Sequence, residues 1–264
     1  SWEYRDFSLR TYPERDSVPF FGSSRNRISL RLWPAQGEAP LVVMVAGLGS
    51  GANAGYYDFL ASRFQQRGFH VLTFPSPFHW SFALSASRNF LPGITRLDAE
   101  DLYGVIARGI AKAKDREKIK VSSIGLLGVS MGGLEAAYVS EIDGREKKIG
   151  FAKVLLVNPP VNPLFSADAL DALAAQGAGL SDGQKGDLKQ RLILFGAEAL
   201  MEKDIKSPDY FLGFETRLPT TLEERQFLIG SSLKDFLGPM IFASQQGKDL
   251  SVLKSPISTE DPEE

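Results

Sequence analysis

One serine in this chain stands in a setting suited to nucleophilic chemistry. Residues 128–132 read Gly-Val-Ser-Met-Gly, the pattern G-x-S-x-G. An apolar stretch before the motif, residues 121–128, predicts a buried strand, and residues 133–142 predict a helix. A sharp turn between a strand and a helix exposes a serine hydroxyl for attack, and only small neighbours fit such a turn. The spacing therefore predicts Ser130 as a nucleophile.

A serine nucleophile needs a base, and histidine is scarce here. The chain has two histidines, His70 and His79. His79 follows the strand predicted over residues 70–74, so we expect it at the same sheet edge as Ser130. His70 begins that strand and belongs at the opposite edge, where it would be inert. His79 is therefore the histidine that could act as a catalytic base.

No carboxylate stands out as the acid that would orient such a base. Asp249 follows an apolar stretch, and Glu198 lies in another, but both stretches have a helical pattern. Asp98 and Asp101 open a predicted helix, where carboxylates favour the helix dipole and cap the first turn. The acid is therefore unassigned.

The elements that would position these residues alternate between strands and helices. Two half-exposed strands, predicted over residues 2–12 and 26–33, form an antiparallel opening pair. Four continuous apolar runs predict strands buried on both faces. These runs are residues 41–47, 70–74, 121–128 and 151–157, and helices are predicted over residues 56–67, 97–114 and 133–142. This order predicts an α/β fold, a doubly wound, mostly parallel sheet with helices on both faces.

The character of the chain changes after residue 163. Residues 164–250 contain amphipathic helical stretches and few strand signals, which predicts a helical lid inserted next to the core of residues 1–163. The predicted helices cover residues 167–175, 184–201 and 222–242. Residues 251–264 are polar and acidic and predict a loose tail.

Two motifs in this order resemble the α/β-hydrolase superfamily. They are Gly-Val-Ser-Met-Gly-Gly at residues 128–133, as the nucleophile elbow, and Ala-Gly-Leu-Gly-Ser-Gly at residues 46–51, as the loop after the third strand. The resemblance covers about residues 2–163. It implies a serine hydrolase that proceeds through a covalent acyl-enzyme on Ser130.

The same resemblance implies an oxyanion hole. In that family, one donor is the N–H after the nucleophile and another is an N–H of the loop after the third strand. These positions correspond to Met131 and Leu48 here. Family members often have a histidine before the first glycine of that loop, whereas this chain has Ala46. Backbone donors do not depend on that side chain.

The resemblance also implies a histidine late in the chain, but none follows residue 79. Three hypotheses remain open. The acid and the base come from a segment that continues past Glu264 or from a second chain that completes the sheet. Alternatively, His79 is the base. In the third hypothesis the protein is a pseudoenzyme that binds a ligand or a partner without turnover.

The composition excludes several function classes. The 264 residues include 30 Lys and Arg, 32 Asp and Glu, and no Cys, with a net charge of −2. Such a balance argues against nucleic acid as a partner, and the lack of Cys excludes disulfides, thiolate metal clusters and cysteine nucleophiles. No stretch is apolar enough to span a membrane. Serine hydrolysis needs no metal or organic cofactor.

The sequence says less about location and substrate. The chain begins at Ser1 without Met, so we expect a processed or trimmed product, and the absence of Cys gives a preference for an extracytoplasmic compartment. Large apolar side chains, among them Phe78, Trp80 and Phe165, predict an apolar cleft for a hydrophobic ester or a lipid. Esterase, lipase, thioesterase and peptidase activities share the same serine motif and stay open.

Overall fold

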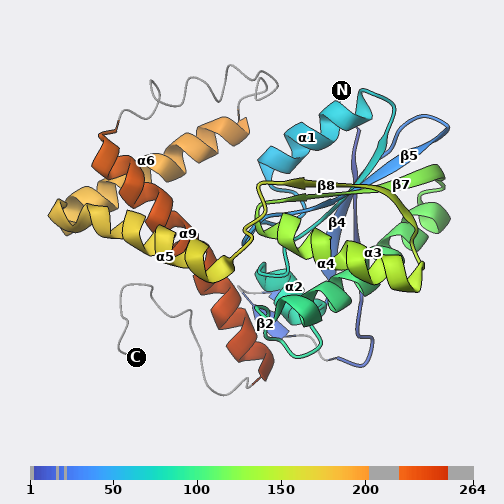
Figure 1. The fold of residues 1–264 in the computed structure, drawn as a ribbon, viewed down its shortest axis with the longest axis horizontal. Coiled ribbons are helices and arrows are strands. Elements are labelled where there is room, and N and C mark those ends of the chain that lie inside the picture. Colours follow the sequence, from blue (N-terminus) through green and yellow to red (C-terminus); the bar gives the residue numbers. More distant parts are fainter. Residues whose placement is uncertain (1–2, 16–17, 21–22, 202–219, 249–264) are drawn as a thin grey trace. The chain divides into compact units, whose positions relative to one another are not determined.

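A computed structural model of the chain describes residues 3–15, 18–20, 23–201 and 220–248 (Figure 1). It divides into two compact units, one formed by Ser1–Val161 with Leu237–Glu264 and the other by Asn162–Phe236. The predicted tail, residues 251–264, lies outside the described residues.

The first unit is built on a six-stranded sheet in the order β1-β4-β6-β5-β7-β8. The strands are β1 (Arg5–Leu9), β4 (Ile28–Trp33), β5 (Glu38–Val45), β6 (His70–Phe74), β7 (Lys120–Val129) and β8 (Phe151–Val157), and a separate hairpin pairs β2 (Val18–Phe20) with β3 (Ser23–Arg25). The last four strands of the sheet run parallel, whereas β1 and β4 are antiparallel to their neighbours. The predicted mostly parallel sheet is thus confirmed.

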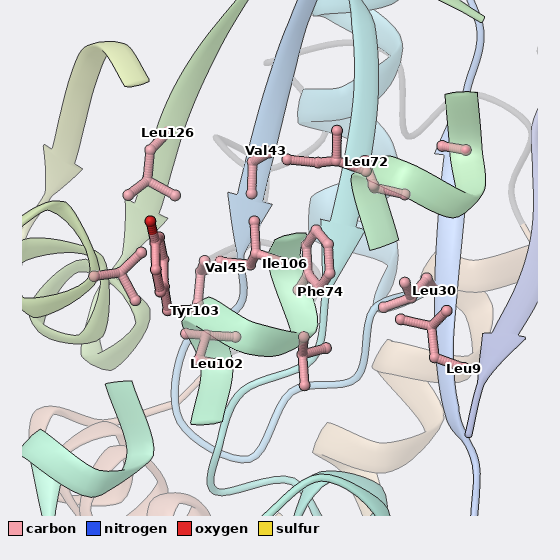
Figure 2. Packing of buried hydrophobic residues seen from close by; sticks show 14 of the residues in the cluster. Leu9, Leu30, Val43, Val45, Leu72, Phe74, Leu102, Tyr103, Ile106 and Leu126 are labelled. Atoms are coloured by element: carbon pink, nitrogen blue, oxygen red, sulfur yellow. The ribbon is translucent and has the colours of Figure 1, made fainter. Parts of the chain in front are cut away.

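Helices cover both faces of this sheet (Figure 1). The first unit contains α1 (Gly55–Gln65), α2 (Trp80–Ser85), α3 (Thr95–Arg116) and α4 (Met131–Glu146). Alternation along β5 shows how both faces are filled. Val43 and Val45 pack in the cluster that includes α3 and α4, part of which Figure 2 shows, whereas Val42 and Met44 pack with Tyr57 of α1. Successive strand side chains point to opposite faces, so a continuous apolar run indicates this arrangement.

The prediction that residues 151–157 are buried on both faces is wrong. Within the part of the chain that the structure describes, β8 ends the sheet with β7 as its one strand neighbour, and Leu155 is 53% exposed. On one side of β8 lies α4, and on the side of α1 the described residues leave an apolar groove of about 550 Å³ over β5, β7 and β8. The apolar run indicates burial, but no described element supplies the cover.

The second unit is helical, as the sequence predicts. It holds α5 (Pro163–Ala175), a 3₁₀ turn (Gln176–Gly179), α6 (Asp182–Met201) and the first part of α9 (Leu222–Lys248). Leu188, Phe227 and Leu228 form its buried cluster. A Cβ on Gly230 would overlap the backbone of α5, so this glycine permits the close approach of α5 and α9. That the unit acts as a lid stays a prediction.

The unit boundaries differ slightly from those expected. The break lies after Val161, and the end of α9 from Leu237 onward belongs to the first unit, where Phe242 packs against Leu84 of α2. None of the helices that the structure describes is both long enough and apolar enough to cross a bilayer.

Candidate functional site

Ser130 occupies the turn between β7 and α4. Its backbone has φ 54° and ψ −126°, a left-handed conformation that is costly for a residue with a side chain. The N–H of Ser130 donates to the carbonyl oxygen of Val157 at 2.8 Å, which fixes the turn against the end of β8. The residue itself is exposed. A strained backbone therefore presents an accessible hydroxyl at the carboxyl edge of the sheet.

Two glycines make this turn sterically possible. A Cβ on Gly128 would overlap the carbonyl oxygen of Gly132, and a Cβ on Gly132 would overlap the carbonyl oxygens of Val45 and Ala46. The start of α4 thus lies directly against the ends of β7 and β5. Any larger residue at either position would push the helix away from the sheet.

The loop after β5 lies beside Ser130 and is held at several points. A Cβ on Gly47 would lie 3.2 Å from the Cβ of Ser130, so the loop and the serine are in close approach. The hydroxyl of Tyr57 accepts the N–H of Gly47 at 2.5 Å. Further along, the N–H of Ser76 donates to the carbonyl oxygen of Ser50 at 2.9 Å. The loop after β6 and helix α1 together fix the conformation of this segment.

Two backbone N–H groups beside Ser130 are available as hydrogen-bond donors. Within the described part of the chain, no hydrogen bond uses the N–H of Leu48 or that of Met131. Met131 is the first residue of α4, where the helix dipole favours negative charge. The chain leaves β5 toward β6 on one side and returns to β7 on the other, and such switch points form ligand crevices in α/β sheets.

His79 has a structural task in this arrangement. Its Nδ1 accepts the N–H of Ser81 at 3.2 Å, which caps the start of α2. The same Nδ1 lies 2.7 Å from the hydroxyl oxygen of Ser81, a group that can donate or accept, so both neutral tautomers of His79 are compatible with this contact. Burial lowers the pKa of His79 to about 4, so the ring is neutral at pH 7.

His79 nevertheless lies close to the loop after β5. A Cβ on Gly51 would lie 3.4 Å from Nε2 of His79, and no hydrogen bond between described residues joins His79 to Ser130. The second histidine, His70, is buried, and its two ring nitrogens bond to the N–H of Ala35 and the carbonyl oxygen of Lys120. His70 is the first residue of β6, and these bonds fix the start of that strand.

The acidic candidates have other partners. Asp98 accepts the N–H of Gly93 at 2.7 Å, and Asp101 accepts both the backbone N–H and the Nε of Arg88. These carboxylates therefore hold the loop before α3, rather than capping the first turn of the helix. Burial raises the pKa of Asp98 to about 6. Glu198 lies in α6, and Asp249 lies outside the described residues.

Sequence reasoning missed one acidic residue, Glu135, which is fully buried in α4. Among the described residues, neither of its carboxylate oxygens finds a hydrogen-bond partner. Burial, with a smaller contribution from the charge of Asp98, raises the pKa of Glu135 to about 9. The signal was present in the sequence, because Glu135 shares a helix face with Val139 and Ile142, both of which are buried.

The aromatic residues expected to line a cleft are distributed over both units. Trp80 packs against Leu84 and Phe242 in a small cluster of the first unit, and Phe78 is half-buried next to it in sequence. Phe165 belongs to α5 in the second unit and is 70% exposed. Trp80 thus contributes to packing, and a substrate-binding role for these three residues stays a prediction.

Comparisons with known proteins give a likeness of structure. No protein-family model matches the chain, and no curated protein matches it. Among solved structures, Est1E from Butyrivibrio proteoclasticus is 14% identical (TM-score 0.37; 60% of this chain, 56% of that chain). The α/β hydrolase GrgF from Penicillium sp. sh18 is 17% identical (0.41; 69% and 56%). An esterase from the archaeon Pyrobaculum calidifontis is 22% identical (0.39; 60% and 46%). The chain thus spans about half the length of these structures.

Proposed function

We propose that this chain carries the nucleophile and the oxyanion hole of a serine hydrolase that cleaves a carboxylic ester. The observation that carries the proposal is the juxtaposition of an exposed, strained Ser130 with two free backbone N–H groups, those of Leu48 and Met131. Preorganised donors of this kind stabilise the negative oxygen of a tetrahedral intermediate, and each contributes about 3 kcal/mol.

The reaction proceeds in two halves. The Oγ of Ser130 forms a bond to the ester carbonyl carbon while its proton passes to a base, and the carbonyl oxygen becomes an anion between the N–H groups of Leu48 and Met131. Collapse of this intermediate breaks the bond to the alcohol, which leaves with the proton from the base. Water then attacks the acyl-enzyme by the same route and releases the acid and Ser130.

Among the described residues, no hydrogen bond joins a base or an acid to the hydroxyl of Ser130, and His79 is engaged with Ser81 at the start of α2. We propose that both the base and the acid come from polypeptide that pairs with the free edge of β8, in a further segment of the protein or in a second chain. The exposed apolar side chains of β8 and the adjoining groove of about 550 Å³ support this proposal.

A hydrophobic acyl group or a lipid-like ester is the substrate that we propose. The support is the aromatic character of the chain after β6, where Phe78 and Trp80 follow each other closely at the catalytic edge. An apolar acyl chain gains free energy from contact with such side chains, and a charged one does not.

The second candidate function is binding without turnover. The neutral His79, engaged in capping α2, favours this reading for the chain by itself. The same fold would then bind a lipid or a small molecule at the crevice, or act as a scaffold for a partner chain.

A fluorophosphonate probe separates the two functions. We expect a covalent adduct on Ser130, located by peptide mass, and loss of both the adduct and ester turnover in Ser130→Ala with an unchanged circular dichroism spectrum. Ser122→Ala is the matched control, because Ser122 is an exposed serine of β7, the strand that ends just before Ser130, and this variant should be labelled like the wild type. The probe is applied to the full protein together with any partner chain that it binds, and folded wild-type protein without an adduct on Ser130 in that state would contradict the hydrolase and favour binding.

A further inference from the structure

The side chain of Tyr57 links helix α1 to the loop beside Ser130. Tyr57 is 5% exposed and packs with Met44 and Leu127 on the α1 face of the sheet. Its hydroxyl oxygen accepts the N–H of Gly47 at 2.5 Å. A buried ring thus places one polar atom at the start of the loop.

That polar atom and Ser130 border the same position. A Cβ on Gly47 would lie 3.3 Å from the hydroxyl oxygen of Tyr57 and 3.2 Å from the Cβ of Ser130. The absence of a side chain at Gly47 lets the tyrosine, the loop and the serine meet. The contact is therefore at the reaction centre and not at the periphery of the fold.

The hydrogen bond determines which N–H groups of the loop are available. Gly47 is buried, so its N–H needs a protein acceptor, and the tyrosine hydroxyl is the acceptor that the described residues provide. The next N–H in the chain, that of Leu48, donates to no described residue. Without the phenol oxygen, the peptide between Ala46 and Gly47 would have to rotate toward another acceptor, and Leu48 would move with it.

We propose that Tyr57 is a positioning residue of the reaction: it holds the N–H of Gly47 so that the N–H of Leu48 stays directed at the carbonyl oxygen of the substrate. The inference rests on the proposed hydrolase function. It assigns to α1 a part in catalysis through the loop that Tyr57 holds. The phenol acts through its oxygen as an acceptor, which only its hydroxyl group can supply.

The neighbouring tyrosine provides a matched control. Tyr56 is 47% exposed, and its ring contacts that of Tyr57 edge to face at a centroid distance of 5.6 Å. Tyr56→Phe and Tyr57→Phe remove the same atom from adjacent positions of one helix. Only the second change removes the acceptor of Gly47.

The experiment measures the rate at which a fluorophosphonate probe labels Ser130 over a range of probe concentrations, in the full protein together with any partner chain that it binds. We expect Tyr57→Phe to lower the limiting rate at least tenfold, with the half-saturating concentration unchanged, and Tyr56→Phe to match the wild type. A general loss of folding would instead reduce the fraction that can be labelled, which circular dichroism and thermal unfolding detect.

The outcomes are distinguishable. Labelling of Tyr57→Phe within twofold of the wild type would overturn the positioning role while leaving the hydrolase intact. A wild type that is not labelled on Ser130 would remove the hydrolase function and this role with it. Amide hydrogen exchange of the wild type gives a test that needs no variant: Gly47 should exchange slowly and Leu48 fast, and fast exchange at Gly47 would contradict the inference.

Discussion

The polar groups at the two ends of helix α4 differ in whether they have hydrogen-bond partners. At the C-terminal end, Asp143 accepts the hydroxyl of Tyr103 and the N–H groups of Ile149, Gly150 and Phe151, which fixes the turn into β8. At the N-terminal end, no described residue accepts the N–H of Met131 or bonds to the buried carboxyl of Glu135. The hydrogen bonds at the C-terminal end therefore stabilise the fold.

This difference separates the end of α4 whose hydrogen bonds stabilise the fold from the end whose polar groups do not. Unsatisfied buried groups cost free energy, so they persist at positions that serve another purpose. The free N–H groups at the start of α4 fit the proposed oxyanion hole. The structure gives no partner that would explain Glu135, and its charge state makes the same end sensitive to pH.

The largest effect should come from closing the approach of α4 to the sheet. Gly132→Ala places a methyl group on the carbonyl oxygens of Val45 and Ala46, and we expect a loss of more than about 4 kcal/mol in the free energy of unfolding. Gly144→Ala is the matched control at the other end of α4, because a Cβ there meets nothing within 4 Å. That variant should gain about 0.5–1 kcal/mol from its better helix propensity. Equal changes in the free energy of unfolding for Gly132→Ala and Gly144→Ala, measured by urea denaturation, would contradict the predicted difference between the two ends of α4.

Removing the satisfied carboxylate should have the next largest effect. Asp143→Ala leaves one hydroxyl and several N–H groups without their acceptor, and we expect a loss of about 3 kcal/mol. Burial raises the pKa of Asp143, but these donors outweigh it and leave the pKa lowered. The carboxylate therefore stabilises the fold above its unfolded pKa, and this contribution is lost as the pH falls through the folded value.

The control for this prediction is Glu141→Ala. Glu141 pairs with Arg145 on the surface of the same helix at 3.7 Å, and both side chains are more than half exposed. Such pairs contribute little, so the free energy of unfolding should change by less than about 0.5 kcal/mol. A pH-independent effect of Asp143→Ala in thermal unfolding would show that the charge of Asp143 is not what holds the turn.

The smallest effect should be a gain. Glu135→Leu replaces a buried, unpartnered carboxyl by a side chain that suits the core, and we expect about 2 kcal/mol more stability at pH 7. The raised folded pKa of about 9 means that the wild type loses stability as the pH rises from about 4.5 to about 9. The variant should lack this slope in thermal unfolding. A parallel pH dependence in both proteins would contradict the assignment.

The sequence predicts well those features that depend on neighbours along the chain. The bounds of β6 and β8 agree with the apolar runs, and the turn at Ser130 follows from the change between a strand pattern and a helix pattern. Glycines on both sides of the serine indicated the close packing that the structure contains. These are local signals, and each occupies about ten residues.

The features that escaped prediction join residues far apart in the sequence. The partners of Asp143 are 40 positions before it and up to eight after it, and no periodicity marks such a cluster. The bond from Gly47 to Tyr57 depends on where α1 comes to lie against β5. The exposure of β8 was missed because hydrophobicity indicates a preference for burial and does not name the element that provides it.

The central position of β5 has a consequence for how this chain folds. β5 pairs with β6 within the first 74 residues, but its other neighbour, β7, begins only at Lys120. During synthesis one edge of the apolar strand β5 thus stays unpaired while more than forty further residues emerge. Long-range parallel pairing is slow, and open edges in that interval promote association between nascent chains. We therefore expect any need for a chaperone to arise in the interval before α4 is synthesised.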